Sequence, residues 1–475
     1  MYHMSRKKIN KNEYGLDVID INSKGLGVAK SKKGVVYFIK NTVPGDIVDI
    51  HAYKKRKGHF EAEPIKWVKR SSQRTRPTCE HFGVCGGCKL QHFSYDGQLN
   101  SKEKGVINNL KHIGKLKINK SLPIVGAENT FYYRNKMEFS FSNKRWLTTD
   151  EIKEDAIIEH RGLGFHKPGM WDKVVDINKC HLQAKPSNEI RNAIRSYALE
   201  KKLAFFDHRQ QSGFLRTLMI RNTLAGEIMV LIQFYKEDKK KRELLLNFIQ
   251  NKFPKIISLM YCINSKGNDS IYDQKIYCHS GNEFITEYLD ELQFRITPKS
   301  FYQTNPKQAK ILYDVAKSFA QLKSTDIVYD LYTGTGTIAL YLAKYCAKII
   351  GIESVSEAID SAKLNAEINM IKNANFELGD MKDCFNDDFI SRYGKADVVI
   401  TDPPRNGMHK DVIKQLLKLE PKKIVYISCN SSTQARDLEF MKTKYEVVIS
   451  QAVDMFPQTH HVENIVLLKL NSNNE

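Results

Sequence analysis

The chain has 475 residues, 41% of them hydrophobic and 27% charged, and its net charge is +20. This composition is typical of a soluble globular protein with roughly two to four domains. No run of about 18 apolar residues occurs and the amino terminus lacks an apolar signal core, so we expect a cytoplasmic protein that neither enters a membrane nor is secreted.

The positive charge is concentrated in the first quarter of the chain. Residues 1–120 contain 25 Lys and Arg against 10 Asp and Glu, a net charge of +15, whereas the rest contains 49 against 44. A solvated basic surface would explain a modest excess, but this concentration favours a site for nucleic acid.

Residues 1–70 are predicted to form a small β-barrel. Short β-forming runs near residues 16–21, 34–39 and 46–50 are separated by turn sequences that contain glycine. The basic run at residues 54–57 falls in a loop or hairpin, where it could contact phosphates. Barrels of this kind often bind single-stranded or looped nucleic acid. Phe60 and Trp67 could stack on bases or simply fill the barrel core.

Three closely spaced cysteines follow the barrel. Cys79, Cys85 and Cys88 lie within ten residues, with glycines between the last two, and Cys180 is a candidate fourth ligand. In a reducing cytoplasm they are expected as thiols or metal ligands rather than disulfides. Their spacing predicts metal binding, and four thiolates suit either tetrahedral zinc or an iron–sulfur cluster.

Residues 71–290 are predicted to form a mixed α+β middle domain that contains these cysteines. Many short β-like runs occur there, and two helices are expected near residues 185–202 and 240–252. From residue 291 to 475, strand and helix alternate, which is typical of a doubly wound, Rossmann-like sheet. The expected parallel strands lie at residues 326–331, 348–353, 375–380, 397–402 and 423–428, and an antiparallel pair at 445–455 and 465–470.

A glycine turn follows the first of these strands. The sequence Asp330-Leu-Tyr-Thr-Gly334-Thr-Gly336 allows a tight turn and close approach to a ligand, but it lacks the further residues of dinucleotide and triphosphate sites. Glu353, at the end of the second strand, could accept both ribose hydroxyls, and Asp380, after the third, could contact an adenine amino group. Together these residues predict a site for S-adenosylmethionine, which has no phosphates.

Two more strands end in reactive groups, Asp402 and Cys429. In an open parallel sheet both face one crevice, although a buried structural cysteine is the common alternative. With Glu463, these groups suit methylation of uracil carbon 5: a thiolate adds to carbon 6, carbon 5 takes the methyl group, and a base removes its proton. Asp402 could hold the ring, and Arg405 could neutralise enolate charge or a phosphate. The target uridine must be unstacked or flipped.

At this point the chain resembles the bacterial RNA uridine-5-methyltransferases, and most of all the 23S ribosomal RNA enzymes with an amino-terminal TRAM domain. The resemblance covers nearly the whole chain. It is carried by the four cysteines and by Ser300-Phe-Tyr-Gln-Thr-Asn305, Asp330-Leu-Tyr-Thr-Gly-Thr-Gly, Asp402-Pro-Pro-Arg-Asn-Gly, Ser428-Cys-Asn with Ala435-Arg-Asp437, and Asp454-Met-Phe-Pro-Gln-Thr-His-His-Val-Glu463.

The resemblance implies specific roles. It implies a 4Fe–4S cluster rather than zinc at Cys79, Cys85, Cys88 and Cys180, contacts with the methyl donor by Gln303, Tyr332, Glu353 and Asp402, Cys429 as nucleophile and Glu463 as proton-abstracting base. The expected partner is 23S ribosomal RNA, bound by a monomer. Three alternatives stay open: a transfer RNA enzyme acting in the T loop, a catalytically inactive RNA-binding assembly factor, and a redox sensor built around the cluster.

Overall fold

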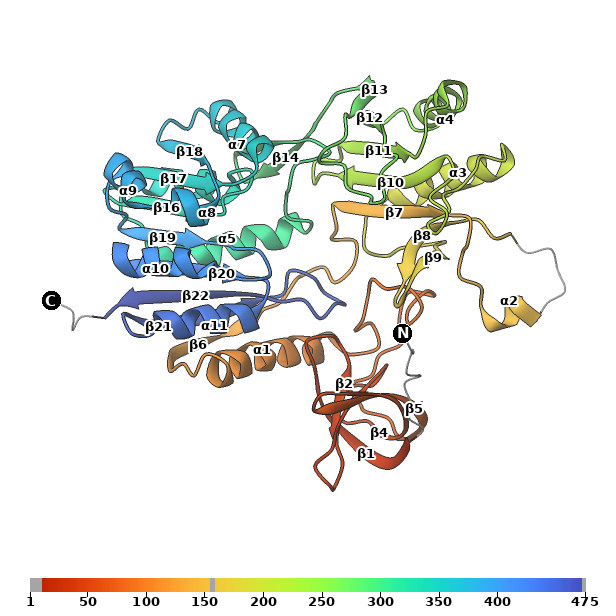
Figure 1. Cartoon of the computed structure of the whole chain (residues 1–475), viewed down its shortest axis with the longest axis horizontal. Coiled ribbons are helices and arrows are strands. Elements are labelled where there is room, and N and C mark those ends of the chain that lie inside the picture. Colours follow the sequence, from red (N-terminus) through yellow and green to blue (C-terminus); the bar gives the residue numbers. More distant parts are fainter. Residues whose placement is uncertain (1–10, 154–158, 472–475) are drawn as a thin grey trace, which may run out of the picture.

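A computed structural model describes residues 11–153 and 159–471. The chain forms a barrel, a mixed middle sheet and a large, mostly parallel sheet (Figure 1). The predicted multidomain α/β fold is therefore confirmed. Residues 1–10, with which the predicted barrel domain begins, lie outside the described part. Among the described residues, none of the helices combines the length and the apolar character needed to cross a bilayer.

The barrel closes through five strands in the order β1-β2-β3-β5-β4. Buried and partly exposed positions alternate along β4, as expected of a strand with one face toward a core. Phe60 and Trp67 pack against the barrel core, and Phe60 stacks on Tyr37 with ring centroids 5.6 Å apart. The strands are β1 (Lys11–Ile21), β2 (Gly27–Lys30), β3 (Val36–Ile39), β4 (Ile47–Arg56) and β5 (His59–Lys69).

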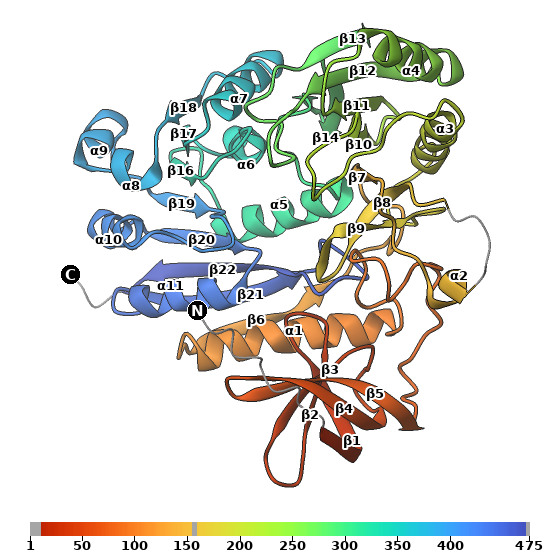
Figure 2. The ribbon, with the colours of Figure 1, turned by 45° about the vertical axis from the view of Figure 1, so that its right-hand side comes forward.

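Helix α1 (Tyr95–His112) and strand β6 (Ile118–Val125) follow the cysteine-containing segment. The sequence assigned them to the middle domain, but the structure places them with the carboxyl-terminal sheet: β6 pairs with β21 (Tyr445–Val453) in parallel, and α1 packs on α11 (Ser431–Met441). Figure 2 shows β6 running between α1 and the rest of that sheet. Residues early in the chain therefore complete the edge of the sheet.

The middle domain is a seven-stranded sheet in the order β13-β12-β11-β10-β7-β8-β9. Both predicted helices are present as α3 (Ser187–Glu200) and α4 (Lys239–Lys252), and α2 (Thr149–Lys153) is short. The strands are β7 (Lys136–Ser142), β8 (Gly162–Lys167), β9 (Met170–Asp176), β10 (Leu215–Asn222), β11 (Ile228–Phe234), β12 (Ile256–Ile263) and β13 (Tyr277–Gly281); the separate hairpin β14 (Ile285–Leu289) and β15 (Leu292–Ile296) follows.

The third sheet has eight strands in the order β18-β17-β16-β19-β20-β22-β21-β6. Strands β16 to β20 are parallel, and β22 runs antiparallel to both β20 and β21. Their bounds are β16 (Ile327–Leu331), β17 (Lys348–Glu353), β18 (Ala374–Leu378), β19 (Val398–Thr401), β20 (Lys423–Ser428) and β22 (Glu463–Leu470).

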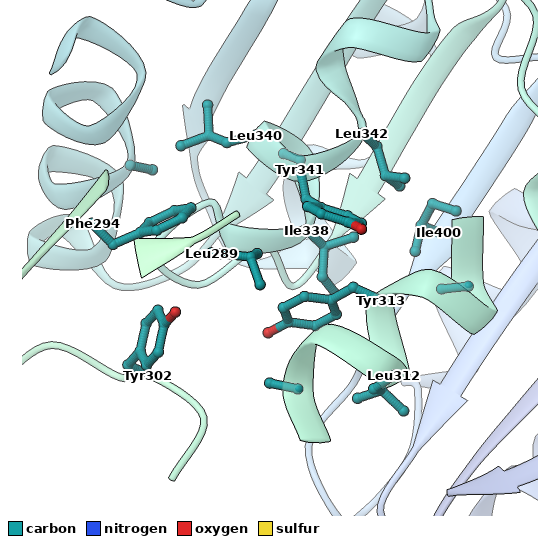
Figure 3. Packing of buried hydrophobic residues seen from close by; sticks show 14 of the residues in the cluster. Leu289, Phe294, Tyr302, Leu312, Tyr313, Ile338, Leu340, Tyr341, Leu342 and Ile400 are labelled. Carbon is teal, nitrogen blue, oxygen red and sulfur yellow. The ribbon is translucent and has the colours of Figure 1, made fainter. Parts of the chain in front are cut away.

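Helices cover both faces of this sheet, so its strands are buried on two sides. On one face, Leu312 and Tyr313 of α5 pack near Ile338 and Tyr341 of α6 and Ile400 of β19 (Figure 3). The helices are α5 (Pro306–Ala320), α6 (Thr337–Leu342) with the short η1 (Ala343–Tyr345), α7 (Ser356–Ile368), α8 (Met381–Cys384), α9 (Asp387–Tyr393) and α10 (Lys410–Leu419). This packing fixes the strand ends that carry the site.

Candidate active site

The three predicted catalytic residues lie where the parallel strands β19 and β20 end and the antiparallel strand β22 begins. In Figure 1 these ends of the strands point toward the middle domain. Asp402 directly follows β19, Cys429 directly follows β20, and Glu463 is the first residue of β22. In the antiparallel pair β20–β22, Ser428 lies opposite Asn464. That pair is the last one between the two strands, and Cys429 and Glu463 are the residues directly beyond it. They lie close enough for the Glu463 carboxyl group to raise the pKa of the Cys429 thiol.

The charges at these strand ends act on one another. Burial raises the pKa of the Cys429 thiol to about 11, and the carboxyl groups of Glu463 and Asp402 add to the increase, whereas Arg405 opposes it. Burial also raises the pKa of Glu463, with a further increase from Asp402 and a decrease from Arg405. The structure therefore brings the thiol, both carboxyl groups and the guanidinium into one electrostatic environment.

Two buried carboxyl groups at these strand ends, those of Asp402 and Asp330, have raised pKa values. The pKa of Asp402 is raised by burial and by the nearby Asp330. Burial raises the pKa of Asp330 to about 7, although it accepts a hydrogen bond from the Thr333 hydroxyl at 2.5 Å. Like charges in a poorly solvated site cannot all ionise. A cation placed beside them would restore their ionised forms.

A cavity of about 560 Å³ lies beside these strand ends. Four of the predicted donor-binding residues line it: Tyr332, Gly334, Glu353 and Asp402. The Glu353 carboxylate accepts hydrogen bonds from the backbone N–H of Gly334 at 3.1 Å and of Ser354 at 2.7 Å. These bonds hold the carboxylate at the end of β17, where an acidic group can bind a ribose.

The two glycines of the turn have different roles. Gly334 has a φ of 57° and borders the cavity, with nothing within 4 Å of the position that a Cβ would occupy. Gly336 has a φ of 79°, and its Cβ would lie 3.0 Å from side-chain atoms of Ala362 and Phe376. Gly334 thus lets a ligand approach the backbone, whereas Gly336 lets the turn pack on α7 and β18.

Three predicted donor-binding residues are not among those that line the cavity. Gly336 lies behind it, and the Gln303 carbonyl accepts a hydrogen bond from the Asn135 side chain at 3.1 Å. Asp380 does not end a strand: it is exposed and caps α8, accepting from the Lys382 backbone at 3.2 Å. The sequence located these motifs but not the direction of each side chain.

The cavity also includes residues that the sequence analysis did not single out. Phe301 is 62% exposed although it is a large aromatic residue, and its carbonyl accepts from the Thr335 hydroxyl at 3.1 Å. Its place within the motif at residues 300–305 was the available signal. Further lining residues are Tyr272, Thr297, Lys299, Ser300, Ser354, Val355, Glu357, Ala358, Ser361 and Pro404.

Asp437 holds the loop that follows β19. It is fully buried in α11 and accepts hydrogen bonds from the Met408 backbone at 2.8 Å and from the Tyr426 hydroxyl at 2.7 Å. The carbonyl of Arg405 accepts from the Asn430 side chain at 3.0 Å. The loops after β19 and β20 are thereby joined, which fixes the distance between their reactive groups.

The four predicted metal ligands line a second cavity of about 180 Å³: Cys79, Cys85, Cys88 and Cys180. Burial raises the pKa of Cys85 to about 11 and of Cys88 to about 12. Among the described residues, no group of three or more His, Cys, Asp or Glu side chains is arranged closely enough to hold one metal ion. Four thiols around one cavity have the donor chemistry of either a zinc ion or an iron–sulfur cluster.

A doubly wound sheet with a glycine turn, an acidic residue ending its second strand and no phosphate-binding loop defines the class of S-adenosylmethionine-dependent methyltransferases. Residues 215–471 match the family model described as tRNA (Uracil-5-)-methyltransferase. The chain therefore belongs to the family of RNA uracil-5 methyltransferases, enzymes that methylate uracil in RNA.

Similar proteins span the whole chain. An uncharacterized RNA methyltransferase of Bacteroides thetaiotaomicron is 49% identical over 452 residues, which cover 94% of this chain and 99% of that protein. One of Porphyromonas gingivalis is 48% identical over 465 residues, which cover 96% and 100%. The structure of the Pyrococcus abyssi tRNA (uracil-54, C5)-methyltransferase in complex with S-adenosyl-L-homocysteine is 30% identical, with a TM-score of 0.74 and coverage of 95% and 99%.

Proposed function

We propose that the protein methylates carbon 5 of a uridine in 23S ribosomal RNA, through a covalent bond between Cys429 and the uracil. The observation that supports this mechanism is that Cys429 and Glu463 directly follow the last pair of β20 and β22, within electrostatic reach of Asp402, which borders the donor cavity. Methylation of a ring carbon needs both a nucleophile and a base, whereas methylation of an amino group needs no thiol.

The proposed steps balance as follows. Cys429, as thiolate, bonds to uracil carbon 6, and the electrons of the ring double bond form an enolate. Carbon 5 then bonds to the methyl group, and the donor sulfur leaves with the former bonding pair. Glu463 takes the carbon-5 proton, the electrons of that C–H bond restore the ring double bond, and the C6–S bond breaks to return the thiolate.

Asp402 and Arg405 are proposed to assist these steps. Asp402 borders the donor cavity and raises the pKa of both Cys429 and Glu463. A cationic sulfonium beside Asp402 favours the ionised form of the Asp402 carboxyl group, which donor binding requires. The same positive charge favours the ionised form of Glu463, which proton abstraction requires. Asp402 would then hold the uracil edge, and Arg405 would offset the negative charge of the enolate.

Two substitutions test the mechanism. Cys429→Ala should abolish both turnover and the covalent RNA adduct, while Glu463→Gln should accumulate methylated RNA linked to the protein, seen as a shifted band on a denaturing gel. Cys278→Ala, a half-buried cysteine in β13, is the matched control and should methylate normally. Methylation by Cys429→Ala at the wild-type rate would exclude Cys429 as the nucleophile. Binding of the methyl donor by the wild-type protein without transfer to any RNA would instead favour an inactive RNA-binding factor.

The second candidate substrate is transfer RNA. The Pyrococcus abyssi relative that matches along nearly the whole chain is described as a tRNA (uracil-54, C5)-methyltransferase. The ribosomal proposal rests instead on the resemblance carried by the amino-terminal barrel and the four cysteines. Mass-spectrometric mapping of 5-methyluridine in ribosomal and transfer RNA from a strain lacking the gene separates the two: the modification should vanish from only one of them.

We further propose a 4Fe–4S cluster held by Cys79, Cys85, Cys88 and Cys180, in a monomer. The proposed domains are residues 1–70, 71–290 and 291–475, with α1 and β6 of the second segment packed on the sheet of the third. The shared cavity that these four thiols line supports this ligand set. Anaerobically purified protein should contain about four iron and four sulfide per chain, and Cys88→Ala should lower both. One zinc and no sulfide would contradict the cluster, and methylation that switches reversibly with its oxidation would favour the redox sensor.

A further inference from the structure

Residues 454–462, between β21 and β22, form the loop that leads into Glu463, and we call them the base loop. Each of its first five residues, 454–458, is bound to other parts of the protein. Val453 lies opposite Glu463 where β21 pairs with β22, but the pairing of β22 with β20 ends one residue later, at Asn464. Glu463 is therefore held by a partner strand on one side only, and the base loop must help to fix its position.

Helix α1 holds the beginning of the base loop through a buried ion pair. Lys102 lies 2.7 Å from Asp454, and both side chains are almost fully buried. The Asp454 carboxylate also accepts a hydrogen bond from the Tyr95 hydroxyl at 3.0 Å and one from the Phe456 backbone at 3.1 Å. The Lys102 ammonium donates to the Phe456 carbonyl at 3.3 Å. All these partners converge on two residues of the loop.

A second set of hydrogen bonds to the base loop comes from Gln98, one helical turn before Lys102. Gln98, 1% exposed, exchanges hydrogen bonds with Gln458: its amide nitrogen lies 3.1 Å from the Gln458 side-chain oxygen, and its oxygen accepts from the Gln458 backbone at 3.0 Å. The carbonyl of Gln458 in turn accepts from the backbone of Lys89 at 2.8 Å and of Leu90 at 3.0 Å. Gln458 has a φ of 66°, so this bend is strained unless such contacts hold it.

Other parts of the fold hold the two residues in between. The Met455 carbonyl accepts from the Asn305 side chain at 3.0 Å, and the Pro457 carbonyl accepts from the Tyr133 hydroxyl at 2.9 Å. These groups come from the segment beside the donor cavity and from the middle domain. Because Tyr95, Gln98 and Lys102 lie three and four residues apart, one face of α1 supplies the side-chain bonds to Asp454, Phe456 and Gln458.

We propose that α1 is the positioning element for the proton-abstracting carboxylate, with Gln98 and Lys102 as positioning residues that act through the base loop on Glu463. This inference rests on the proposed role of Glu463 and goes beyond it. Proton abstraction is the last step, after the thiol has bonded to carbon 6 and the methyl group has been transferred. A displaced Glu463 should therefore stall the enzyme as a methylated covalent complex rather than prevent adduct formation.

A double-label experiment measures that step directly. The RNA substrate carries tritium at uridine carbon 5, and the methyl donor carries a ¹⁴C methyl group. Gln98→Glu keeps the side-chain size but loses the donor, and Lys102→Met loses the cation. We expect both to slow tritium release by about tenfold or more, while first-turnover methyl transfer stays within about twofold and methylated RNA accumulates on the protein in a denaturing gel.

Lys111→Met is the matched control, because it makes the same chemical change at an exposed position of α1; it should release tritium at the wild-type rate. Lys102→Arg keeps the cation and should recover most of the rate that Lys102→Met loses. If thermal unfolding shows that Lys102→Met does not fold, Gln98→Glu alone carries the test. Tritium release that keeps pace with methyl transfer in Gln98→Glu and in a folded Lys102→Met would overturn the inference, and so would an equal slowing of tritium release and methyl transfer.

Glu463→Gln, measured in parallel, separates this inference from the proposed function. If Glu463→Gln traps the methylated adduct and the α1 variants do not, only the positioning role fails. If Glu463→Gln itself releases tritium normally, the assignment of the base fails, and with it the reason for the positioning role.

Discussion

At the scale of single residues, the site favours the protonated form of the proposed nucleophile. Burial and two carboxyl groups raise the pKa of Cys429 to about 11, so the thiolate is scarce at neutral pH. Because the thiolate is the reactive form, such a cysteine is protected from alkylation and oxidation until substrates bind. One of these two carboxyl groups, Asp402, borders the cavity where the cationic donor is expected.

The pH dependence of alkylation tests this electrostatic arrangement. Cys429 in wild-type protein should react with iodoacetamide only well above pH 9, and the midpoint should move to lower pH in Glu463→Gln, because a neighbouring carboxylate that opposes the thiolate is gone. Mass spectrometry of the peptide containing Cys429 gives the rate at each pH. The Cys278 peptide is the internal control and should not change. Superimposable Cys429 curves for both proteins would contradict the arrangement.

A second residue-scale prediction concerns Glu287, which is 1% exposed and has a pKa raised to about 7 by burial. The folded protein binds its proton more tightly than the unfolded chain does, so stability is fully present below the unfolded pKa of about 4.3 and is lost as the pH rises to about 7. Glu287→Gln removes this loss and should be more stable than wild type at pH 8, by about 2 kcal/mol.

Denaturant unfolding at pH 5 and pH 8 measures the effect of Glu287→Gln. The advantage of the variant should be much smaller at pH 5, where the wild-type carboxyl group is largely protonated. A variant that is less stable than wild type at both pH values would show that the carboxylate is stabilised in place.

At the scale of elements, the segment from residue 297 to 304 joins the donor cavity to the middle domain. The buried guanidinium of Arg221, on β10, donates to the carbonyl of Thr297 at 3.1 Å and of Ser300 at 2.7 Å. Further along, the backbone N–H of Asn135 donates to the carbonyl of Thr304 at 2.8 Å. A strand of the middle domain thus shapes a wall of the donor cavity.

Arg221→Lys should therefore weaken binding of the methyl donor. A lysine cannot donate to both carbonyls with the geometry of a guanidinium, and hydrogen bonds from charged groups contribute about 1.5–3 kcal/mol each. We expect the KM for S-adenosylmethionine to rise about tenfold or more with a smaller change in kcat, and calorimetry with S-adenosyl-L-homocysteine should show the same loss. Arg209→Lys, an exposed arginine paired with Asp172, is the control; equal donor affinity in both variants would contradict the role of Arg221.

At the scale of the whole molecule, the barrel is attached beside α1 and the cysteine-containing segment. Lys104 of α1 lies 2.8 Å from Asp20 of β1, and a Cβ at Gly25 would lie 3.1 Å from the Lys89 side chain. The basic residues 54–57, at the end of β4 and in the turn to β5, are thereby carried by a barrel that is joined to the catalytic part. Such an attachment would allow these positive charges to contribute to the proposed RNA binding.

Replacing Lys54, Lys55 and Lys57 by Gln should weaken RNA binding without changing donor affinity. Each lysine that contacts a phosphate of single-stranded RNA adds about 0.7 to the salt slope of the binding constant, so the slope should fall by about 2. Filter binding at several salt concentrations measures it. The triple substitution of Lys239, Lys240 and Lys241 on α4 is the matched control; an equal effect of both triples would show that only net charge matters.

The class of fold, and the strand ends that carry Asp402 and Cys429, follow from local patterns in the sequence. Alternating strands and helices specify a parallel sheet, and its topology requires Asp402 and Cys429 to emerge at one edge. Glycine turns and cysteine spacing are likewise local signals. The domain boundaries, the cluster and the residue roles stay predictions.

Which distant segments meet cannot be inferred from local sequence. The pairing of β20 with β22 extends to the residues just before Cys429 and just after Glu463, β6 joins the sheet from the far end of the chain, and α1 holds the base loop through Lys102. None of these contacts has a local pattern of its own. Periodicity in a sequence reflects the burial of one face of an element, whereas the choice of partner and register depends on packing across the whole molecule.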